Sequence, residues 1–84
     1  MCILKGLGMP TILMIYGFRF FFYSREESRM HIHVEYQGRK AKIWLDSFEI
    51  AENHGFYLFE IKEIQKLTRL HEKEFKEAWL SHFR

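Results

Sequence analysis

The chain changes from a two-residue hydrophobic period in its first half to a helical period in its second half. The first half is rich in β-branched and aromatic residues with glycines between its apolar runs, which is typical of strands joined by tight turns. The pattern predicts four strands, at about 11–16, 18–24, 30–36 and 39–46. We interpret residues 47–57 as a connection that ends in a turn at Asn53-His54-Gly55.

The second predicted hairpin, MHIHVEYQGRKAKIWLD at 30–46, sets its own register. With Gln37-Gly38 as a two-residue turn, His33 faces Lys42. Because side chains alternate along a strand, this register gives the sheet two distinct faces. The apolar face carries Ile32, Val34, Tyr36, Ala41, Ile43 and Leu45, and the polar face carries His31, His33, Glu35, Lys40, Lys42, Trp44 and Asp46. A shift of one residue would mix the two faces, so the sequence specifies this register.

Helical spacing begins at about residue 58. The apolar positions are Leu58, Ile61, Ile64, Leu67 and Thr68, followed by Phe75, Ala78, Trp79 and Phe83. A polar stretch around His71 interrupts this stripe without Gly or Pro, so the sequence allows one long bent helix or two helices that meet there. We therefore predict an α+β domain in which one bent or two C-terminal helices cover a small antiparallel sheet of about four strands.

Composition places the chain among small folded domains. Its 84 residues are 48% hydrophobic and 18% aromatic, which is too apolar for a disordered chain and short enough for one domain. We assign residues 9–84 to that domain and interpret residues 1–8 as an N-terminal extension, upstream of an alternative start at Met9. A core of this size leaves a small stability margin, so a protein partner or a second copy is a reasonable expectation.

Charge and cysteine content narrow the function classes. The formal net charge of +2 is too small to indicate nucleic-acid binding by itself. A single cysteine, Cys2, excludes an intramolecular disulfide and a cysteine-based zinc site. The N-terminal apolar run is broken by Lys5 and Pro10, is too short to cross a bilayer and lacks a small-residue cleavage site. We predict a cytoplasmic protein with no membrane partner.

The polar face carries the candidate chemistry. His31 and His33 form an H-x-H motif whose imidazoles share that face. With Lys42 they form the candidate catalytic set, because histidine exchanges protons near neutral pH and lysine can neutralise the charge of a phosphorane. Lys40 and Trp44 are candidate binding residues, the first for phosphate and the second for stacking a base. A metal-free ribonuclease is the sharpest form of this hypothesis.

Other interpretations of the polar face stay open. Glu35 or Asp46 could add a third donor to the two histidines and complete a metal site. Lys40 and Lys42 would repel a cation there, so we predict neither a metal nor another cofactor. The face could also be an ordinary solvated side of a sheet.

Two arginines are further candidate binding residues. Arg19 and Arg25 lie on or just after the second predicted strand, and they would enlarge the basic surface if that strand borders the H-x-H strand. The alternative is that both are ordinary surface arginines. The consecutive phenylalanines at 20–22 must point to both sides of the sheet, so we expect both faces of this strand to be covered.

Several short motifs occur in an order and spacing that are specific when taken together. They are MPTI at 9–12, GFRFFFYS at 17–24, HIHV at 31–34, AKIWL at 41–45, NHGF at 53–56 and AWLSHF at 78–83. From Met9 onward the chain resembles the small bacterial proteins grouped as domain of unknown function 4160. Members often carry proline just before the H-x-H motif, where this chain has Ser28, Arg29 and Met30.

The resemblance implies the toxin half of a type II toxin–antitoxin module, paired with a small antitoxin protein encoded nearby. It marks His31 and His33 as the functional motif, with Lys42 and Trp44 in the neighbouring motif, and it implies no molecular target. Our leading hypothesis is a cytoplasmic toxin that acts on nucleic acid or translation through the polar face. A non-catalytic protein-binding module and a small metal-dependent enzyme are the alternatives, and a homo-oligomer is compatible with each.

Overall fold

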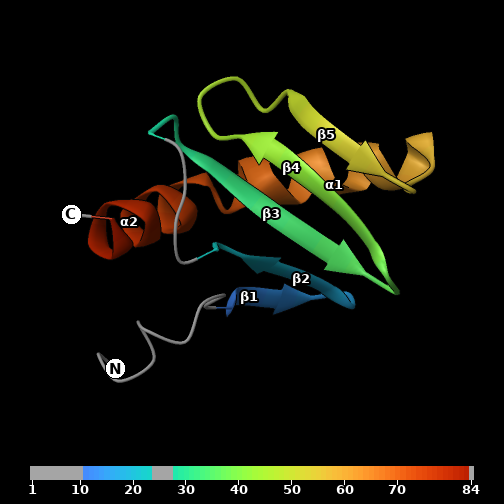
Figure 1. The fold of residues 1–84 in the computed structure, drawn as a ribbon, viewed down its shortest axis with the longest axis horizontal. Coiled ribbons are helices and arrows are strands. Elements are labelled where there is room, and N and C mark those ends of the chain that lie inside the picture. The colour runs from blue at the N-terminus through green and yellow to red at the C-terminus, as the bar shows by residue number, and fades with distance from the viewer. Residues whose placement is uncertain (1–10, 24–27, 84) are drawn as a thin grey trace.

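The computed structural model describes residues 11–23 and 28–83, which form five strands followed by two helices (Figure 1). The strands are β1 (Thr11–Ile15), β2 (Phe18–Phe21), β3 (His31–Tyr36), β4 (Arg39–Trp44) and β5 (Ile50–His54), and the helices are α1 (Leu58–Leu70) and α2 (Glu72–His82). Neighbouring strands are antiparallel and follow the chain order β1-β2-β3-β4-β5. Both helices cover one face of the sheet, which confirms the predicted α+β class.

The hairpin of β3 and β4 has the register that the alternation of side chains predicts. All six cross-strand pairs agree, including His33 opposite Lys42. Gln37 and Gly38 have φ angles of 49° and 79°, as both central residues of a type I′ turn require. The turn chemistry and the hydrophobic pattern therefore specify the same register.

The interpretation of residues 47–57 as a connection was wrong, because they contain a fifth strand, β5. This strand pairs with β4 and places Glu52 opposite Lys42. A register irregularity separates Glu52 from Ile50, so the two-residue alternation that signals a strand is interrupted after its first position. Because the alternation is interrupted, the Asn53-His54-Gly55 sequence indicated a turn, although Asn53 and His54 belong to β5.

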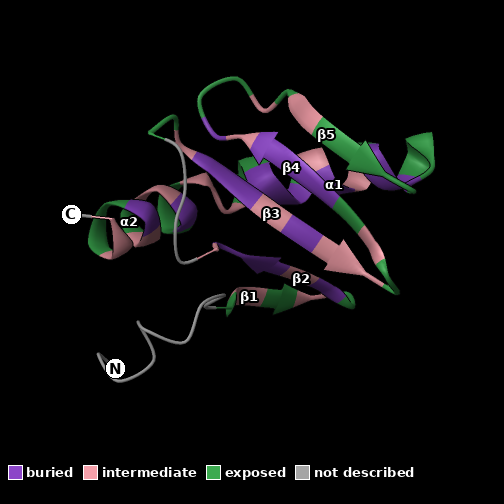
Figure 2. Cartoon of the chain, viewed as in Figure 1, coloured by how far each residue is buried: buried purple, intermediate pink, exposed green. Residues whose placement is uncertain are grey.

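The hydrophobic core lies between the apolar face of the sheet and the two helices (Figure 2). The sheet side contributes Phe18, Phe20, Phe22, Ile32, Val34, Ala41, Ile43 and Leu45, and the helices contribute Ile61, Ile64, Leu67, Phe75 and Trp79. Every residue that the register assigns to the apolar face lies in this core or packs against it. Burial of each large side chain contributes about 1.5–3 kcal/mol, so this face anchors the sheet and leaves the polar face to carry other chemistry.

The helical region forms two helices that meet at His71, the second of the two arrangements that the sequence allowed. His71 has a φ of −108°, and its N–H donates to the Leu67 carbonyl at 3.0 Å. The placement of Leu58 on the buried stripe was wrong, because its side chain is 70% exposed. The first turn of α1 extends past the edge of the sheet (Figure 2), where no strand lies beneath it.

Some predictions fall outside the described residues. The N-terminal extension at 1–8, the start at Met9 and the candidate residue Arg25 are among them. In the part of the chain that the structure describes, no helix has the length and apolar character needed to cross a bilayer.

Candidate functional site

The H-x-H motif lies at the start of β3, on the polar face and beside α2. The ring centroids of His31 and His33 are 5.0 Å apart, and the ring planes are perpendicular. The two imidazoles therefore lie together as the alternation predicts. They differ in exposure, because His31 is completely buried whereas His33 is half-buried.

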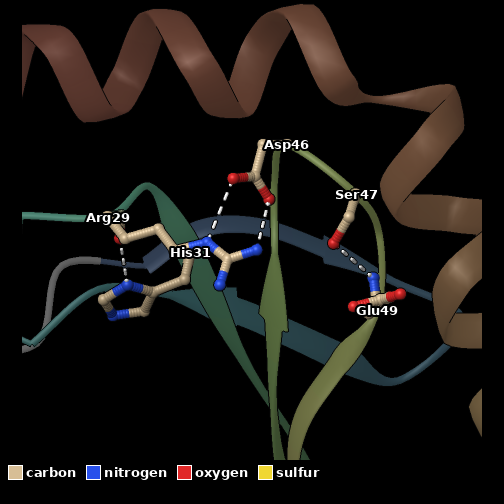
Figure 3. A network of polar contacts seen from close by, with 5 residues as sticks. All are labelled: Arg29, His31, Asp46, Ser47 and Glu49. Carbon is tan, nitrogen blue, oxygen red and sulfur yellow. Dashed lines mark hydrogen bonds and ion pairs between the residues drawn. The ribbon is translucent and has the colours of Figure 1, made fainter.

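Two tryptophans and a backbone carbonyl hold His31 in place. Its ring centroid lies 5.7 Å from that of Trp44 and 5.0 Å from that of Trp79. Its Nδ1 atom lies 2.7 Å from the Arg29 carbonyl oxygen (Figure 3). Because a carbonyl oxygen only accepts hydrogen bonds, Nδ1 carries a proton and donates it. This bond fixes the ring orientation and leaves Nε2 as the basic atom of the neutral imidazole.

His33 lies among aromatic rings and directly opposite a lysine. Phe21 stacks against the imidazole with 5.5 Å between centroids, and the Tyr23 ring meets it at a steep angle at 4.4 Å. Lys42 is its cross-strand partner on β4, and such partners have Cβ atoms about 4.5–5.5 Å apart. A proton-exchanging group and a cation are thus adjacent, an arrangement that can assist the cleavage of a phosphate ester.

The Trp44 indole contacts two cationic side chains. The Cζ atom of Arg29 lies 4.0 Å from the ring centroid, and the Nζ atom of Lys42 lies 4.7 Å from it. Cation–π contacts strengthen when the cation loses water, and Lys42 is only 9% exposed. Trp44, predicted to stack a base, therefore acts in this structure as a platform that holds two cations beside the H-x-H motif.

Arg29 also forms a bidentate ion pair with Asp46 (Figure 3). Its Nε and Nη2 atoms each lie 3.0 Å from a carboxylate oxygen. The hydrogen bond from Arg29 lowers the pKa of Asp46 from its ordinary value, and the positive charge of the guanidinium acts in the same direction. Both side chains are exposed, so we assign this pair an orienting role over Trp44 rather than a large contribution to stability.

Arg19 and Lys40 lie further along the polar face. The strand β2 borders β3, so Arg19 joins this face, where its Nη1 atom lies 3.1 Å from Glu35 Oε1 and its Nε donates to Thr11 Oγ1 at 2.8 Å. Lys40 is exposed opposite Glu35. The predicted site residues that the structure brings together are His31, His33, Lys42 and Trp44.

Three residues of this cluster were missed from the sequence. Phe21 lies opposite His33, a relationship that becomes visible only when the order of the strands is known. Arg29 stood in a charged loop without any periodic pattern. Trp79 belonged to the helical stripe and was assigned to the core, and its contact with His31 depends on where α2 ends relative to the sheet.

The carboxylates considered as metal ligands are engaged with arginines. Glu35 pairs with Arg19, and Asp46 pairs with Arg29. Over residues 11–23 and 28–83, no group of three or more His, Cys, Asp or Glu side chains is placed to hold a metal ion.

Residues 17–80 match the family described as Domain of unknown function (DUF4160). The chain belongs to this family. The DUF4160 match extends from the turn before β2 into α2, so the cluster around His31 and His33 lies entirely within the family domain. No curated protein and no solved structure matched the chain.

Proposed function

We propose that this protein is the toxin of a bacterial two-gene toxin–antitoxin module and that it acts on RNA in the cytoplasm. Residues 17–80 match DUF4160, and the module is suggested by the resemblance of the sequence to this family. The cross-strand placement of His33 opposite Lys42 carries the assignment of the site. Arg29, which contacts the same Trp44 ring as Lys42, supplies further positive charge for a phosphate.

The proposed reaction is cleavage of RNA by its own ribose. A 2′-hydroxyl attacks the adjacent phosphorus, and His33 accepts the hydroxyl proton. Lys42 and Arg29 neutralise the negative charge that develops on the phosphorane oxygens. The bond from phosphorus to the 5′ oxygen then breaks, and the imidazolium of His33 returns the proton to that oxygen. The products are a 2′,3′-cyclic phosphate and a 5′-hydroxyl.

We assign His31 a positioning role in this reaction. It is buried, and its Nδ1 proton is donated to the Arg29 carbonyl. Its perpendicular contact with His33 restricts the orientation of the reacting imidazole. Trp44 orients the two cations, while Arg19 and Lys40 extend the surface for neighbouring phosphates.

We also propose that the antitoxin neutralises the toxin by covering the polar face. Lys42 and Arg29 are the cations that would receive its acidic side chains, because complementary charge directs protein association. An antitoxin bound in this way excludes RNA from His33, so binding and neutralisation depend on the same residues.

Growth of a bacterial host after induction tests this proposal. The bacteria express the intact chain alone, the intact chain with its neighbouring gene, His33→Ala or the double variant His31→Ala/His33→Ala. Lys66→Ala is the control, because Lys66 is an exposed residue of α1, on the opposite side of the sheet from the polar face. We expect arrest by the intact chain and the control, and growth with the neighbouring gene or either His33 variant. Circular dichroism checks that each variant is folded.

Cleavage of an RNA oligonucleotide by the purified chain is the second measurement. We expect 2′,3′-cyclic phosphate ends that form in the presence of EDTA and disappear with His33→Ala. Arrest that persists in folded His33→Ala would move the site away from this face. Absence of both arrest and cleavage would contradict the proposal.

A non-catalytic protein-binding module is the second candidate, and the burial of the cluster favours it. Phe21, His31 and Lys42 are each at most 9% exposed. Buried residues of this kind maintain the shape of a binding surface rather than contact a substrate directly. For such a module, His33→Ala weakens the binding of the neighbouring gene product while the intact chain causes no arrest. Calorimetric titration of that product into both proteins distinguishes the two functions.

A further inference from the structure

The outer edge of β5 is complementary to a second copy of itself. Glu52 and His54 lie on the polar side of this strand, opposite Lys42 and Lys40, and their side chains are 56% and 69% exposed. Among the strands that the structure describes, none pairs with the outer side of β5. We infer that β5 pairs antiparallel with β5 of a second copy, so that the protein forms a symmetric dimer through this edge.

The pairing of Glu52 with His54 favours one register. If the two-fold axis passes through Asn53, Glu52 of each copy faces His54 of the other. A carboxylate can accept a hydrogen bond from an imidazole N–H across the strand pair, whereas two carboxylates directly opposite each other repel. A two-residue slip would place Glu52 opposite Glu52 or His54 opposite His54. Within one copy the His54 Nε2 and Glu52 Oε1 atoms already lie 3.3 Å apart, so carboxylates and imidazoles would alternate over four side chains of the dimer.

Exposed apolar side chains flank the same edge. Tyr57, Leu58 and Phe59 follow β5 closely in the chain, and they are 64%, 70% and 72% exposed. The Tyr57 and Phe59 rings are stacked, with 5.9 Å between centroids and a 6° angle between planes. In the antiparallel register the C-terminal end of β5 in one copy, which precedes Tyr57, lies beside the Ile50 end of β5 in the other. The triad therefore adds apolar contact area to an interface whose strand pairing is short.

The dimer goes beyond the proposed function and does not depend on it. A two-fold axis perpendicular to the sheet puts the same face of both copies on the same side. The two five-stranded sheets would then form one ten-stranded sheet, with both polar faces on one surface and the helices on the other. A partner or a nucleic acid would meet two copies of the site side by side.

Sedimentation velocity of the full chain over a wide concentration range tests this inference. The buffer contains a reductant, because Cys2 could otherwise cross-link two copies. The variants are His54→Glu, which places two carboxylates opposite each other, and Glu52→His/His54→Glu, which exchanges the two residues and keeps each carboxylate opposite an imidazole. Phe59→Ser tests the apolar triad, and Leu70→Ser is its matched control at the other end of α1, with 71% exposure. Circular dichroism confirms the fold of each variant.

We expect a concentration-dependent dimer whose Kd rises about tenfold or more in His54→Glu and in Phe59→Ser. The exchanged double variant and Leu70→Ser should dimerise like the unmodified chain. A chain that stays monomeric at all concentrations overturns the inference. A dimer that His54→Glu or Phe59→Ser leaves unchanged, or one that the exchanged double variant fails to restore, also overturns it. None of these results depends on toxicity or on RNA cleavage.

Discussion

His31 and Trp79 meet at a steep angle with ring centroids 5.0 Å apart, and this contact joins the polar face of the sheet to α2. Trp79 also contacts Phe22 of the core at 5.4 Å. The H-x-H motif is therefore attached to the hydrophobic core through one tryptophan. Changes at His31 should consequently affect stability as well as function.

His31→Phe and His31→Ala separate these two effects. Phenylalanine keeps an aromatic ring, slightly larger than the imidazole, but removes the donor to the Arg29 carbonyl, which should cost about 1–3 kcal/mol of unfolding free energy. Alanine also leaves a cavity and should cost about 2–4 kcal/mol. Urea denaturation followed by tryptophan fluorescence measures both values. Lys66→Ala, at an exposed site on α1, should stay within about 0.5 kcal/mol of the unmodified chain, and an equal cost at both positions would contradict this role of His31.

Asp46 should make stability depend on pH in the acidic range. Its carboxylate is hydrogen-bonded to Arg29 in the folded state, and its pKa is lowered from 3.8. A group with a lowered folded-state pKa contributes stability above its unfolded pKa, and this contribution is lost as the pH falls through the folded value. Asp46→Asn should therefore melt at a lower temperature than the unmodified chain at neutral pH, and the difference should shrink below about pH 4.

Thermal melts of both proteins between neutral and acidic pH measure that difference. Because the Arg29–Asp46 pair is exposed, added salt should also reduce it at neutral pH. A difference that stays constant across the acidic range would show that Asp46 acts through packing rather than through charge.

The sequence predicted only the part of the candidate site that lies on the hairpin of β3 and β4. The period of two and the Gln37-Gly38 turn specify which residues of β3 and β4 share a face, and these positions are confirmed. They contain no information about how deeply each side chain is buried, because elements distant in the sequence determine whether a strand face is covered. The complete burial of His31 involves Trp79, 48 positions along the chain in a separate helix. The sequence therefore identified the residues of the cluster that lie on the hairpin and missed Phe21, Arg29 and Trp79.

Gly17 should be the most sensitive of the turn glycines. Its φ is +85°, and an added Cβ would lie 2.8 Å from Cε1 of Tyr36. Gly38 has a similar φ of +79° but open space around its Cα. Gly38→Ala should cost about 1 kcal/mol from backbone strain alone, and Gly17→Ala should cost about 2–3 kcal/mol because the clash adds to the strain.

Urea titration of the two alanine variants compares these costs directly. In the background of Tyr36→Ala, the cost of Gly17→Ala should fall toward that of Gly38→Ala, since the side chain that it strikes is gone. Equal costs in the unmodified background would mean that Tyr36 moves aside freely.

The fold was predictable where local chemistry and long-range packing agree. The apolar face, the two hairpins and the interruption at His71 each left a pattern in the sequence. The strand β5 left none, because its register irregularity after Ile50 breaks the alternation. The exposure of Leu58 was hidden for a related reason: helical spacing defines a stripe, whereas the extent of the sheet decides how much of that stripe is covered.

Lys42→Met should abolish the proposed RNA cleavage while leaving the fold intact. Methionine keeps a long apolar side chain against Trp44 but removes the charge next to His33, so the developing phosphorane charge loses its nearest cation. Lys40→Met is the matched control, because Lys40 lies two positions away on the same strand and is exposed. We expect loss of growth arrest and at least about a hundredfold slower RNA cleavage for Lys42→Met, with a small effect of Lys40→Met on RNA affinity only. Equal losses of cleavage in both variants would indicate that the lysines only attract RNA through their positive charge. Lys42 would then have no specific role in catalysis.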